Sequence, residues 1–344
     1  MSAPLPFDPA TWEPRLVALA GELRRAARAT ARRGLEARAV HRPVGQGVGD
    51  LTYALDEATE AALTRWFEDT TRHAPLSLFS EDAGWRHRGP DGASRSRELT
   101  GFAHGGPRLV IDPVDGTRPL MADLRSAWSV LALCPPGDGV PHLQEAVSGL
   151  LAELPDTRAA RYRLMMAVKG AGARLEERRL DDDFLVHRAR LVADADDRPD
   201  HGVFSVFRYT PAMRSELARI EAEFFARLER DEGADLRQCF DDQYISNGGQ
   251  LALLAVGTYR LIADVRAHLA PRYEVPVTTS KPYDCAGAIV VAREAGCVVT
   301  GATGAELDFP LDATTPVSFV GWANAATARR LAPHLAAALD AEPN

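Results

Sequence analysis

Two carboxylates with a defined spacing follow a strongly apolar stretch of the chain. Residues 109–111, of the kind that fill a buried strand, lead directly to Asp112 and, three positions later, to Asp115. Gly116 and Thr117 come next and predict a turn into a helix. Carboxylate oxygens are ligands for hard cations, and exposed N–H groups at a turn can receive a phosphate. An ordinary strand, turn and helix with a capping aspartate has the same pattern, so this stretch alone leaves both interpretations open.

The spacing of the two acids separates two kinds of phosphatase. Phosphatases of the haloacid dehalogenase type carry Asp-x-Asp after a strand, whereas Asp112 and Asp115 are three positions apart. Pro113 lacks a backbone donor and has a fixed φ, so we expect the strand to end there with Asp112 and Asp115 turned the same way. A covalent phosphatase of that type is therefore only a weak alternative.

Two further acids occupy comparable positions. Glu81 follows the predicted strand 76–79, and Asp284 is predicted to cap the helix 285–295. If these two acids meet Asp112 and Asp115, their pKa values rise unless cations neutralise them. The set contains no histidine or cysteine, which disfavours zinc and favours Mg²⁺ or Mn²⁺. Any one of these acids alone is more often a cap or a surface residue, so the joint pattern carries the prediction.

Composition limits the class of protein. The chain has 344 residues, 46% of them hydrophobic and 26% charged, as in globular proteins, and its net charge of −8 argues against general nucleic-acid binding. Its cysteines (Cys134, Cys239, Cys285 and Cys297) lack metal-binding or C-x-x-C spacing and predict buried thiols in a reducing compartment. No signal peptide and no membrane-spanning run is evident. We therefore expect a cytoplasmic enzyme without a membrane partner.

Hydrophobic periodicity predicts the elements that must position these acids. The first half is expected to be two helices on a largely antiparallel sheet, with Asp56 early in the second helix. Its predicted helices are 11–39 and 51–67, its strands 76–79, 130–133, 145–151 and 162–168, and its loops 43–49 and 86–107. The second half is predicted to contain strands 204–207, 261–263 and one from 298, and helices 211–230, 250–255, 285–295 and 325–339. We divide the chain loosely near residue 185, into 1–185 and 186–344.

Four motifs in order give the chain a family resemblance. They are Ser80-Glu81-Asp82, Asp112-Pro113-Val114-Asp115-Gly116-Thr117, Tyr283-Asp284-Cys285-Ala286-Gly287 and Glu294-Ala295-Gly296-Cys297, supported by Leu55-Asp56 and Lys169-Gly170-Ala171-Gly172-Ala173. Together they resemble the inositol monophosphatase family, within the lithium-sensitive, magnesium-dependent sugar phosphatases. Its consensus runs Gly-Glu-Glu, Asp-Pro-(Ile/Val/Leu)-Asp-Gly-Thr, Trp-Asp-x-Ala-Ala/Gly and Glu-Ala-Gly-Gly. The resemblance implies an α+β fold, a layered αβαβα sandwich of the inositol monophosphatase and fructose-1,6-bisphosphatase type.

The resemblance also implies a division of roles. Glu81, Asp112 and the Val114 carbonyl would hold one Mg²⁺, Asp112, Asp115 and Asp284 a second, and Glu81 could share a third. Thr117, paired with Asp56, would orient or deprotonate the attacking water, and the Gly116 and Thr117 amides would hold the phosphate. Expected substrate contacts are Asp115, Gly116, Thr117, Asp264 and Lys281. The resemblance further implies direct in-line hydrolysis, Mn²⁺ as a possible substitute, Li⁺ as an inhibitor and a homodimer.

Departures from the family pattern leave the substrate open. Arg118-Pro119-Leu120 replaces the usual segment after the threonine, the block 245–249 is poorly kept, and the connection 266–280 is long enough for a lid or a dimer contact. The leading hypothesis is a phosphomonoesterase for a small polyol or sugar phosphate such as an inositol phosphate. Alternatives are a bisphosphatase for fructose 1,6-bisphosphate or a 3′-phosphonucleotide, and a regulatory or binding member of the fold with little turnover.

Overall fold

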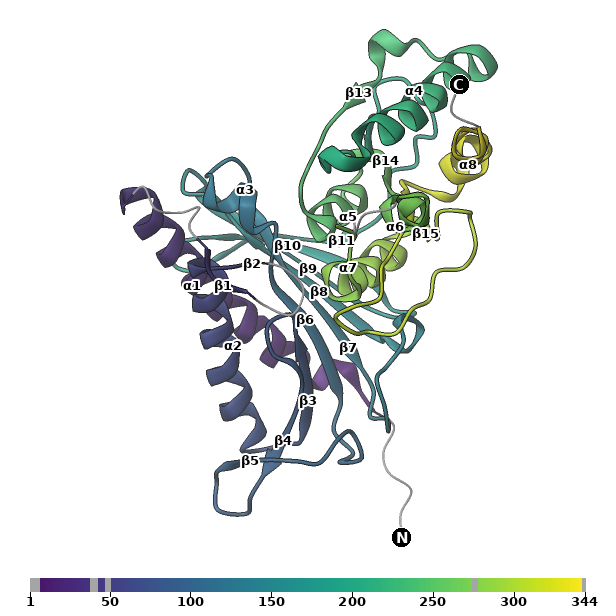
Figure 1. Ribbon diagram of the computed structural model, residues 1–344. Helices are drawn as coiled ribbons and strands as arrows, with labels where there is room; N and C mark the ends of the chain where they lie inside the picture. Colours follow the sequence, from purple (N-terminus) through teal and green to yellow (C-terminus); the bar gives the residue numbers. More distant parts are fainter. Residues whose placement is uncertain (1–6, 38–42, 47–50, 274–277, 342–344) are drawn as a thin grey trace.

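The computed structural model describes residues 7–37, 43–46, 51–273 and 278–341 (Figure 1). Helices and sheets alternate in five layers, in the order helices, large sheet, helices, small sheet, helices. The predicted α+β sandwich of layers αβαβα is confirmed. None of the described helices has the length and apolar character that a bilayer crossing needs.

The helices lie close to their predicted positions. The described residues form α1 (Glu13–Ala37), α2 (Ala54–Thr71), α3 (Thr117–Met121), α4 (Arg214–Glu232), α5 (Asn247–Ala255), α6 (Arg266–Leu269), α7 (Pro282–Ala295) and α8 (Ala325–Asp340). Helix α2 begins later than predicted, because residues 51–53 form a strand. Helix α5 begins earlier than predicted, at a serine cap.

The large sheet carries most of the predicted acids. In the described part of the chain its strands are β3 (Leu76–Ser80), β4 (Gly84–Pro90), β5 (Ser96–Glu98), β6 (Arg108–Asp115), β7 (Ala127–Cys134), β8 (Ser148–Leu154), β9 (Arg161–Val168), β10 (Gly172–Arg179) and β11 (Leu185–Leu191). They are arranged in the order β11-β10-β9-β8-β7-β6-β3-β4-β5. Neighbouring strands are antiparallel except for β3 and β6, which run parallel. The predicted antiparallel sheet under two helices is therefore confirmed.

The small sheet belongs to the second half of the chain. Its described strands are β12 (Val203–Val206), β13 (Phe240–Asp241), β14 (Tyr259–Asp264), β15 (Val298–Thr300) and β16 (Phe319–Trp322), in the order β13-β12-β14-β16-β15. A separate hairpin pairs β1 (Pro43–Gln46) with β2 (Leu51–Tyr53). The large sheet thus extends to residue 191 and the small one begins at residue 203, while the division of the chain near residue 185 stays a proposal.

Apolar side chains fill the spaces between the layers. Helices α1 and α2 bury Leu19, Leu23 and Leu63 against one face of the large sheet. Helices α5 and α7 lie between the two sheets, and α4 and α8 cover the outer face of the small sheet. Burial of this apolar surface is the main force that holds the layers together. Helix α7 thereby rests on the large sheet with its first turn close to the end of β6.

Parallel pairing of β3 and β6 brings two predicted metal ligands together. Ser80 lies opposite Ile111 in the register. The next residues in the two strands are Glu81 and Asp112, so the carboxyl ends of both strands deliver an acid to the same edge of the sheet. This meeting depends on the crossover through residues 81–107, which leaves β3 and returns to it as β6.

A bulge in β6 corrects the prediction that the strand ends at Pro113. Asp112 pairs with Val130 and Asp115 with Trp128, so β6 has one more residue than β7 across this interval. The Pro113 carbonyl accepts a hydrogen bond from the Ser129 hydroxyl at 2.7 Å. A bulge tolerates the missing proline N–H and changes the side-chain alternation. Asp112 and Asp115, three positions apart, therefore both reach the same cavity.

The sequence missed strands at the polar margins of the sheets. Residues 43–46 form β1 inside the predicted loop 43–49, and residues 47–49 lie outside the described residues. Strands β4 and β5 occupy part of the predicted loop 86–107, and β10 and β11 were not predicted. Strand β16 was also not predicted, although it is buried and apolar and lies between β14 and β15. The margins of the large sheet are only partly buried. Their side chains lack the apolar pattern by which a strand is recognised in sequence.

Candidate active site

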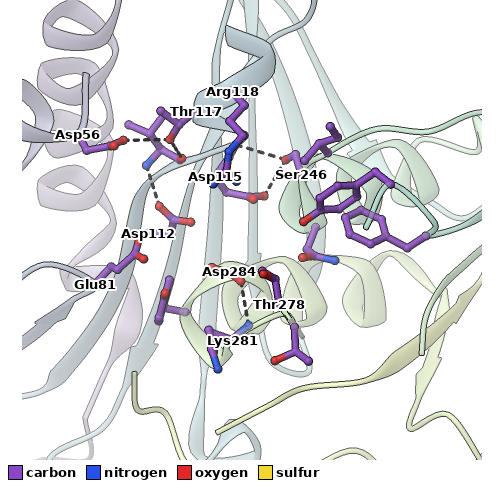
Figure 2. Close-up of a pocket in the computed structure, with 18 of the residues that line it drawn as sticks. Asp56, Glu81, Asp112, Asp115, Thr117, Arg118, Ser246, Thr278, Lys281 and Asp284 are labelled. Carbon is purple, nitrogen blue, oxygen red and sulfur yellow. Dashed lines mark hydrogen bonds between the residues drawn. The ribbon is translucent and has the colours of Figure 1, made fainter. Parts of the chain in front are cut away.

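A cavity of about 350 Å³ lies where the ends of the two sheets meet (Figure 2). Carboxylates from four separate parts of the chain line it. These are Asp56, Glu81, Asp112, Asp115 and Asp284. The cavity therefore brings together the four predicted metal carboxylates and the acid predicted to assist Thr117.

Thr117 and Asp56 form a hydrogen-bonded pair at one side of the cavity. The Thr117 hydroxyl lies 2.9 Å from Asp56 Oδ1 and 2.9 Å from the Val114 carbonyl oxygen. Asp56 is the third residue of α2, and its other oxygen accepts the Tyr53 N–H at 2.8 Å in a capping box. This bond fixes the carboxylate at the helix start. An oxygen of Thr117 is thus held beside a carboxylate that can take a proton.

Asp112 and Asp284 are each held by a backbone donor nearby in sequence. Asp112 Oδ1 accepts the Val114 N–H at 2.8 Å, inside the bulge. Asp284 Oδ2 accepts the Lys281 N–H at 2.8 Å. Asp284 was predicted as the N-cap of its helix, but the cap is Lys281 and Asp284 is the third residue of the turn, because Pro282 occupies the first helical position. Each bond fixes one carboxylate oxygen and leaves the other toward the cavity.

Asp115 is held from the other half of the chain. Its Oδ2 accepts the Ser246 hydroxyl at 2.7 Å and the Gly248 N–H at 2.6 Å, both from the start of α5 (Figure 2). A Cβ on Gly248 would lie 2.9 Å from that oxygen and 2.5 Å from Val130, so glycine permits the approach. We did not assign this role from sequence. The signal was present, because Ser-Asn-Gly-Gly before an apolar run is typical of a helix N-cap.

Gly116 has the backbone geometry that redirects the chain after β6. Its φ of 99° lies in the left-handed region, and a Cβ there would lie 3.1 Å from the Ser246 Cβ. Only glycine adopts this conformation without strain. The turn starts α3 at Thr117, which faces the cavity together with Gly116.

Burial and like charge both act on the carboxylate group. Burial, followed by the charges of Asp115, Asp284 and Glu81, raises the pKa of Asp112 well above its ordinary range. Burial raises the pKa of Asp115 to about 6 although Ser246 and Gly248 donate hydrogen bonds to it. Burial and the charge of Asp115 likewise raise the pKa of Asp284. Such a group favours bound cations or bound protons.

The donor set fits a hard divalent cation. In the part of the chain that the structure describes, no three His, Cys, Asp or Glu side chains lie close enough together to hold a metal ion. Mutual repulsion keeps carboxylates apart when nothing neutralises them, and oxygen ligands suit Mg²⁺. Glu81 and Tyr283 both line the cavity. Glu81, Asp112, the Val114 carbonyl, Asp115 and Asp284 are the groups that would hold such ions.

We expect the metal-free protein to gain thermal stability as the pH falls, because the native state keeps Asp115 protonated up to about pH 6. A carboxylate whose folded pKa lies above its unfolded pKa of 3.8 disfavours the folded state once the pH exceeds both values. Chelator-treated protein should therefore have a higher Tm at about pH 5.5 than at about pH 8, and Mg²⁺ should raise the Tm more at the higher pH. Asp115→Asn should flatten both trends. An equal Mg²⁺-induced shift at the two pH values would contradict this expectation.

The rest of the cavity wall differs from the prediction. Arg118, Phe207, Tyr209 and Lys281 line it, and the Lys281 ammonium also donates to the Thr314 carbonyl at 3.1 Å. Asp264, predicted to contact the substrate, is fully buried and is not among the lining residues. That role is not supported by its position. Because β12 and β14 are parallel, their ends bring Phe207 and Tyr209 beside the residues that follow Asp264.

The connection 266–280 contributes two described parts to this region. Helix α6 and a short 3₁₀ turn, Ala270–Arg272, form its first part, and Thr278 and Thr279 at its end line the cavity. Residues 274–277 lie outside the described part of the chain. Whether the connection acts as a lid or a dimer contact stays a prediction.

Comparison with known proteins gives a consistent result. The model of the inositol monophosphatase family matches residues 13–342. Among solved structures, fructose-1,6-bisphosphatase from Leishmania major has a TM-score of 0.68 at 13% identity and covers 95% of this chain and 94% of its own. SuhB from Mycobacterium tuberculosis has a TM-score of 0.60 at 18% identity, with coverage of 97% and 99%.

A third solved structure is named for an activity of the same family. Inositol monophosphatase II from Staphylococcus aureus has a TM-score of 0.53 at 16% identity, with coverage of 94% and 95%. None of the curated proteins matches the sequence. At these identities the solved structures establish the fold alone.

Proposed function

Because this chain belongs to the inositol monophosphatase family, we propose that it is a metal-dependent phosphomonoesterase for a small polyol or sugar phosphate. The observation that carries the proposal is the convergence of Glu81, Asp112, Asp115 and Asp284 on one cavity. Such a set of buried acids is costly without cations and suits a phosphate once cations are bound.

Metal ions have assigned places in this proposal. Glu81, Asp112 and the Val114 carbonyl would hold one Mg²⁺, and Asp112, Asp115 and Asp284 a second, with Glu81 available to a third. Bound there, Mg²⁺ would neutralise the acids, polarise the phosphoryl oxygens and lower the pKa of a coordinated water.

The chain's own residues would orient the reactants. A water beside Thr117 Oγ1 would donate a proton to that oxygen, while the Thr117 hydroxyl proton shifts toward Asp56 Oδ1, 2.9 Å away. The Gly116 and Thr117 amides would donate to a phosphoryl oxygen at the turn after β6. Water would attack phosphorus in line with the ester oxygen, without a covalent phosphoenzyme. Positioning and fixed charge would supply most of the rate acceleration.

A bisphosphatase is the second candidate for the same site. Arg118 and Lys281 both line the cavity, and either would bind a second anionic group of a substrate. The solved structures of similar fold include a fructose-1,6-bisphosphatase, and SaIMPase-II bound to inositol monophosphate in one structure and to 2′-AMP in another. The range of these ligands keeps sugar, polyol and nucleotide phosphates as candidate substrates.

We expect a panel of phosphate esters to separate these candidates. With Mg²⁺ present, release of inorganic phosphate should be fastest from one class among polyol, sugar, nucleotide and bisphosphate esters. If a bisphosphate leads, Arg118→Gln should raise its KM about tenfold or more and change the KM of a monophosphate little, because one charge-assisted contact is lost. Equal effects on both esters would argue against a second anion site at Arg118. Capture of a protein partner, without release from any ester, would favour the regulatory alternative.

The remaining expectations rest on the family alone. Substitution of Mn²⁺ for Mg²⁺, inhibition by Li⁺, a homodimer and a cytoplasmic location are part of the proposal. Enzyme assays with each ion and a measured mass in solution test the first three.

A further inference from the structure

Asp264 forms an ion pair with Arg266 behind the cavity wall. Asp264 is the last residue of β14 and has no exposed surface, while Arg266 opens α6 and is 1% exposed. Arg266 Nε lies 2.9 Å from Asp264 Oδ1, and Arg266 Nη2 lies 2.6 Å from Asp264 Oδ2. Burial alone would raise the pKa of Asp264, but the guanidinium lowers it below its ordinary value. Both partners are therefore charged.

The guanidinium has no donor left for a substrate. Beyond its bonds to Asp264, its Nη2 donates to the Ser280 hydroxyl at 3.0 Å, and its Nη1 donates to the Tyr209 hydroxyl at 3.2 Å and the Thr278 carbonyl at 2.9 Å. These five bonds use all five N–H groups of an arginine. The ring of Phe207 lies against the guanidinium, 4.3 Å from its carbon. Arg266 is thus locked in place, although its edge lines the cavity.

The carboxylate oxygens of Asp264 also have their hydrogen-bond partners within the protein. Besides Arg266, its Oδ2 lies 2.6 Å from the Ser280 hydroxyl and 3.1 Å from the Asn247 Nδ2. The Ser280 hydroxyl also lies 2.6 Å from Asn247 Oδ1, and its single proton serves one of these acceptors at a time. A sugar hydroxyl would have to displace one of these buried bonds, which costs the desolvation of its former partner.

Asp264 is linked through Asn247 to the turn that holds Asp115. Asn247 is the first residue of α5, between Ser246 and Gly248. Both of these neighbours donate to Asp115 Oδ2, at 2.7 Å and 2.6 Å. The bond from Asn247 to Asp264 therefore anchors the turn from which Asp115 is held.

Asp264 is linked through Ser280 to the turn that holds Asp284. Ser280 immediately precedes Lys281, whose N–H donates to Asp284 Oδ2 at 2.8 Å. The Ser280 backbone is fixed on its other side, where its carbonyl accepts the Val317 N–H at 2.9 Å. Asp264 thus lies between the two turns and bonds to a side chain of each.

We propose that Asp264 is a positioning residue that, through Asn247 and Ser280, sets the spacing of Asp115 and Asp284 at the second metal site. This inference rests on the proposed function, because it takes these two carboxylates as ligands of one ion. It replaces the expected contact between Asp264 and a sugar hydroxyl. The substrate side of the cavity then offers no acid beyond the metal ligands and Asp56 among its described lining residues.

The test is the affinity of the protein for Mg²⁺ without substrate, measured by titration calorimetry on wild type and Asp264→Asn. Loss of a group that orients metal ligands commonly weakens metal binding about 10- to 100-fold, and we expect a loss in this range. The Mg²⁺ concentration for half-maximal activity should rise in parallel, and KM should change alike for esters with and without a sugar. Unchanged Mg²⁺ affinity with a raised KM for sugar esters alone would overturn the proposal in favour of a substrate contact.

Two further variants separate positioning from stability. Asp194→Asn removes one of the two acidic partners of Arg260, a buried arginine of β14 whose Nη1 lies 2.8 Å from Asp194. It should lower the Tm and leave Mg²⁺ affinity unchanged. Ser280→Ala keeps the ion pair between Asp264 and Arg266. It should weaken Mg²⁺ binding by about fivefold, which is the effect of one lost hydrogen bond. If Asp264→Asn does not fold, Ser280→Ala is measured in its place. Equal Mg²⁺ affinity of Ser280→Ala and wild type would contradict the proposal.

The proposed function can fail separately from this inference. Wild-type protein that binds Mg²⁺ but releases no phosphate from any ester would reject the phosphatase proposal, while the calorimetric comparison of variants would still test the role of Asp264. Wild-type phosphatase activity together with equal Mg²⁺ affinity in Asp264→Asn would reject only the positioning role.

Discussion

Asp112→Asn is expected to abolish metal-dependent phosphate release. Asp112 is the ligand assigned to both metal ions, and its carboxylate lies between Glu81, which follows β3, and Asp115 beyond the bulge. Loss of a shared ligand removes several kcal/mol of charge stabilisation in the transition state, so about 4 kcal/mol or about a thousandfold in kcat/KM is expected. Initial rates of phosphate release at saturating Mg²⁺ measure this loss.

The same variant should have an opposite effect on stability. The amide of asparagine can still accept the Val114 N–H that Asp112 Oδ1 accepts at 2.8 Å, while the repulsion from the neighbouring acids disappears. Metal-free Asp112→Asn should therefore unfold at a higher temperature than wild type at pH 8, and Mg²⁺ should no longer raise that temperature. Asp138→Asn, in the exposed turn after β7, is the matched control and should change neither quantity. Retained Mg²⁺-dependent activity in Asp112→Asn would contradict the assignment.

Thr117→Val is expected to lower kcat by about 10²- to 10³-fold, within the range typical of a lost proton-transfer group. Valine has nearly the shape of threonine but lacks the hydroxyl. In the wild type that hydroxyl, whose oxygen lies 2.9 Å from Asp56 Oδ1, would pass a proton from the attacking water to Asp56. Because Thr117 is not assigned as a metal ligand through its side chain, Mg²⁺ affinity should change little. Rates at saturating ester and Mg²⁺, with Mg²⁺ affinity measured separately, give the comparison.

Thr117 and Asp56 should behave as one unit. Asp56→Asn should cost nearly as much as Thr117→Val, and the double variant should be little slower than either single one, because each change already breaks the same proton path. Thr117→Ser keeps the hydroxyl and should retain most of the rate. A double variant whose loss is the product of the two single losses would show that the residues act independently.

The carboxylates of the candidate site could be predicted because each is encoded by a local pattern. An apolar strand that leads into an acid gives the element and the ligand together, as at Leu78-Phe79-Ser80 before Glu81 and Val110-Ile111 before Asp112. Apolar periodicity also placed most helices. These signals are local, and the meeting of the strand ends then follows once β3 and β6 are parallel neighbours.

Long-range packing decided what the sequence could not predict. The continuation of β6 past Pro113 depends on β7, whose Ser129 bonds to the bulge. The hold on Asp115 depends on Ser246, which is 131 residues away. Asp264 ends a predicted strand as expected, but only the fold shows that Arg266 and its neighbours enclose it. No spacing along one chain encodes such partners.

Polar margins account for the missed strands of the large sheet. In β11 the residues are mostly exposed, and the strand pairs on one side only, with β10. Residues there gain little from apolar burial, so His and Arg interrupt the expected alternation. Strand pairing through the backbone holds such segments in the sheet regardless of side-chain pattern.

The most direct test of the account is the rate of phosphate release by the wild-type protein as a function of Mg²⁺ concentration, on the best ester of the panel. The account predicts no release in excess chelator, saturable activation as Mg²⁺ is added, and no such activation in Asp112→Asn. Release that is unchanged by chelator, or no release from any ester with either Mg²⁺ or Mn²⁺, would contradict a metal-dependent phosphatase built on Glu81, Asp112, Asp115 and Asp284.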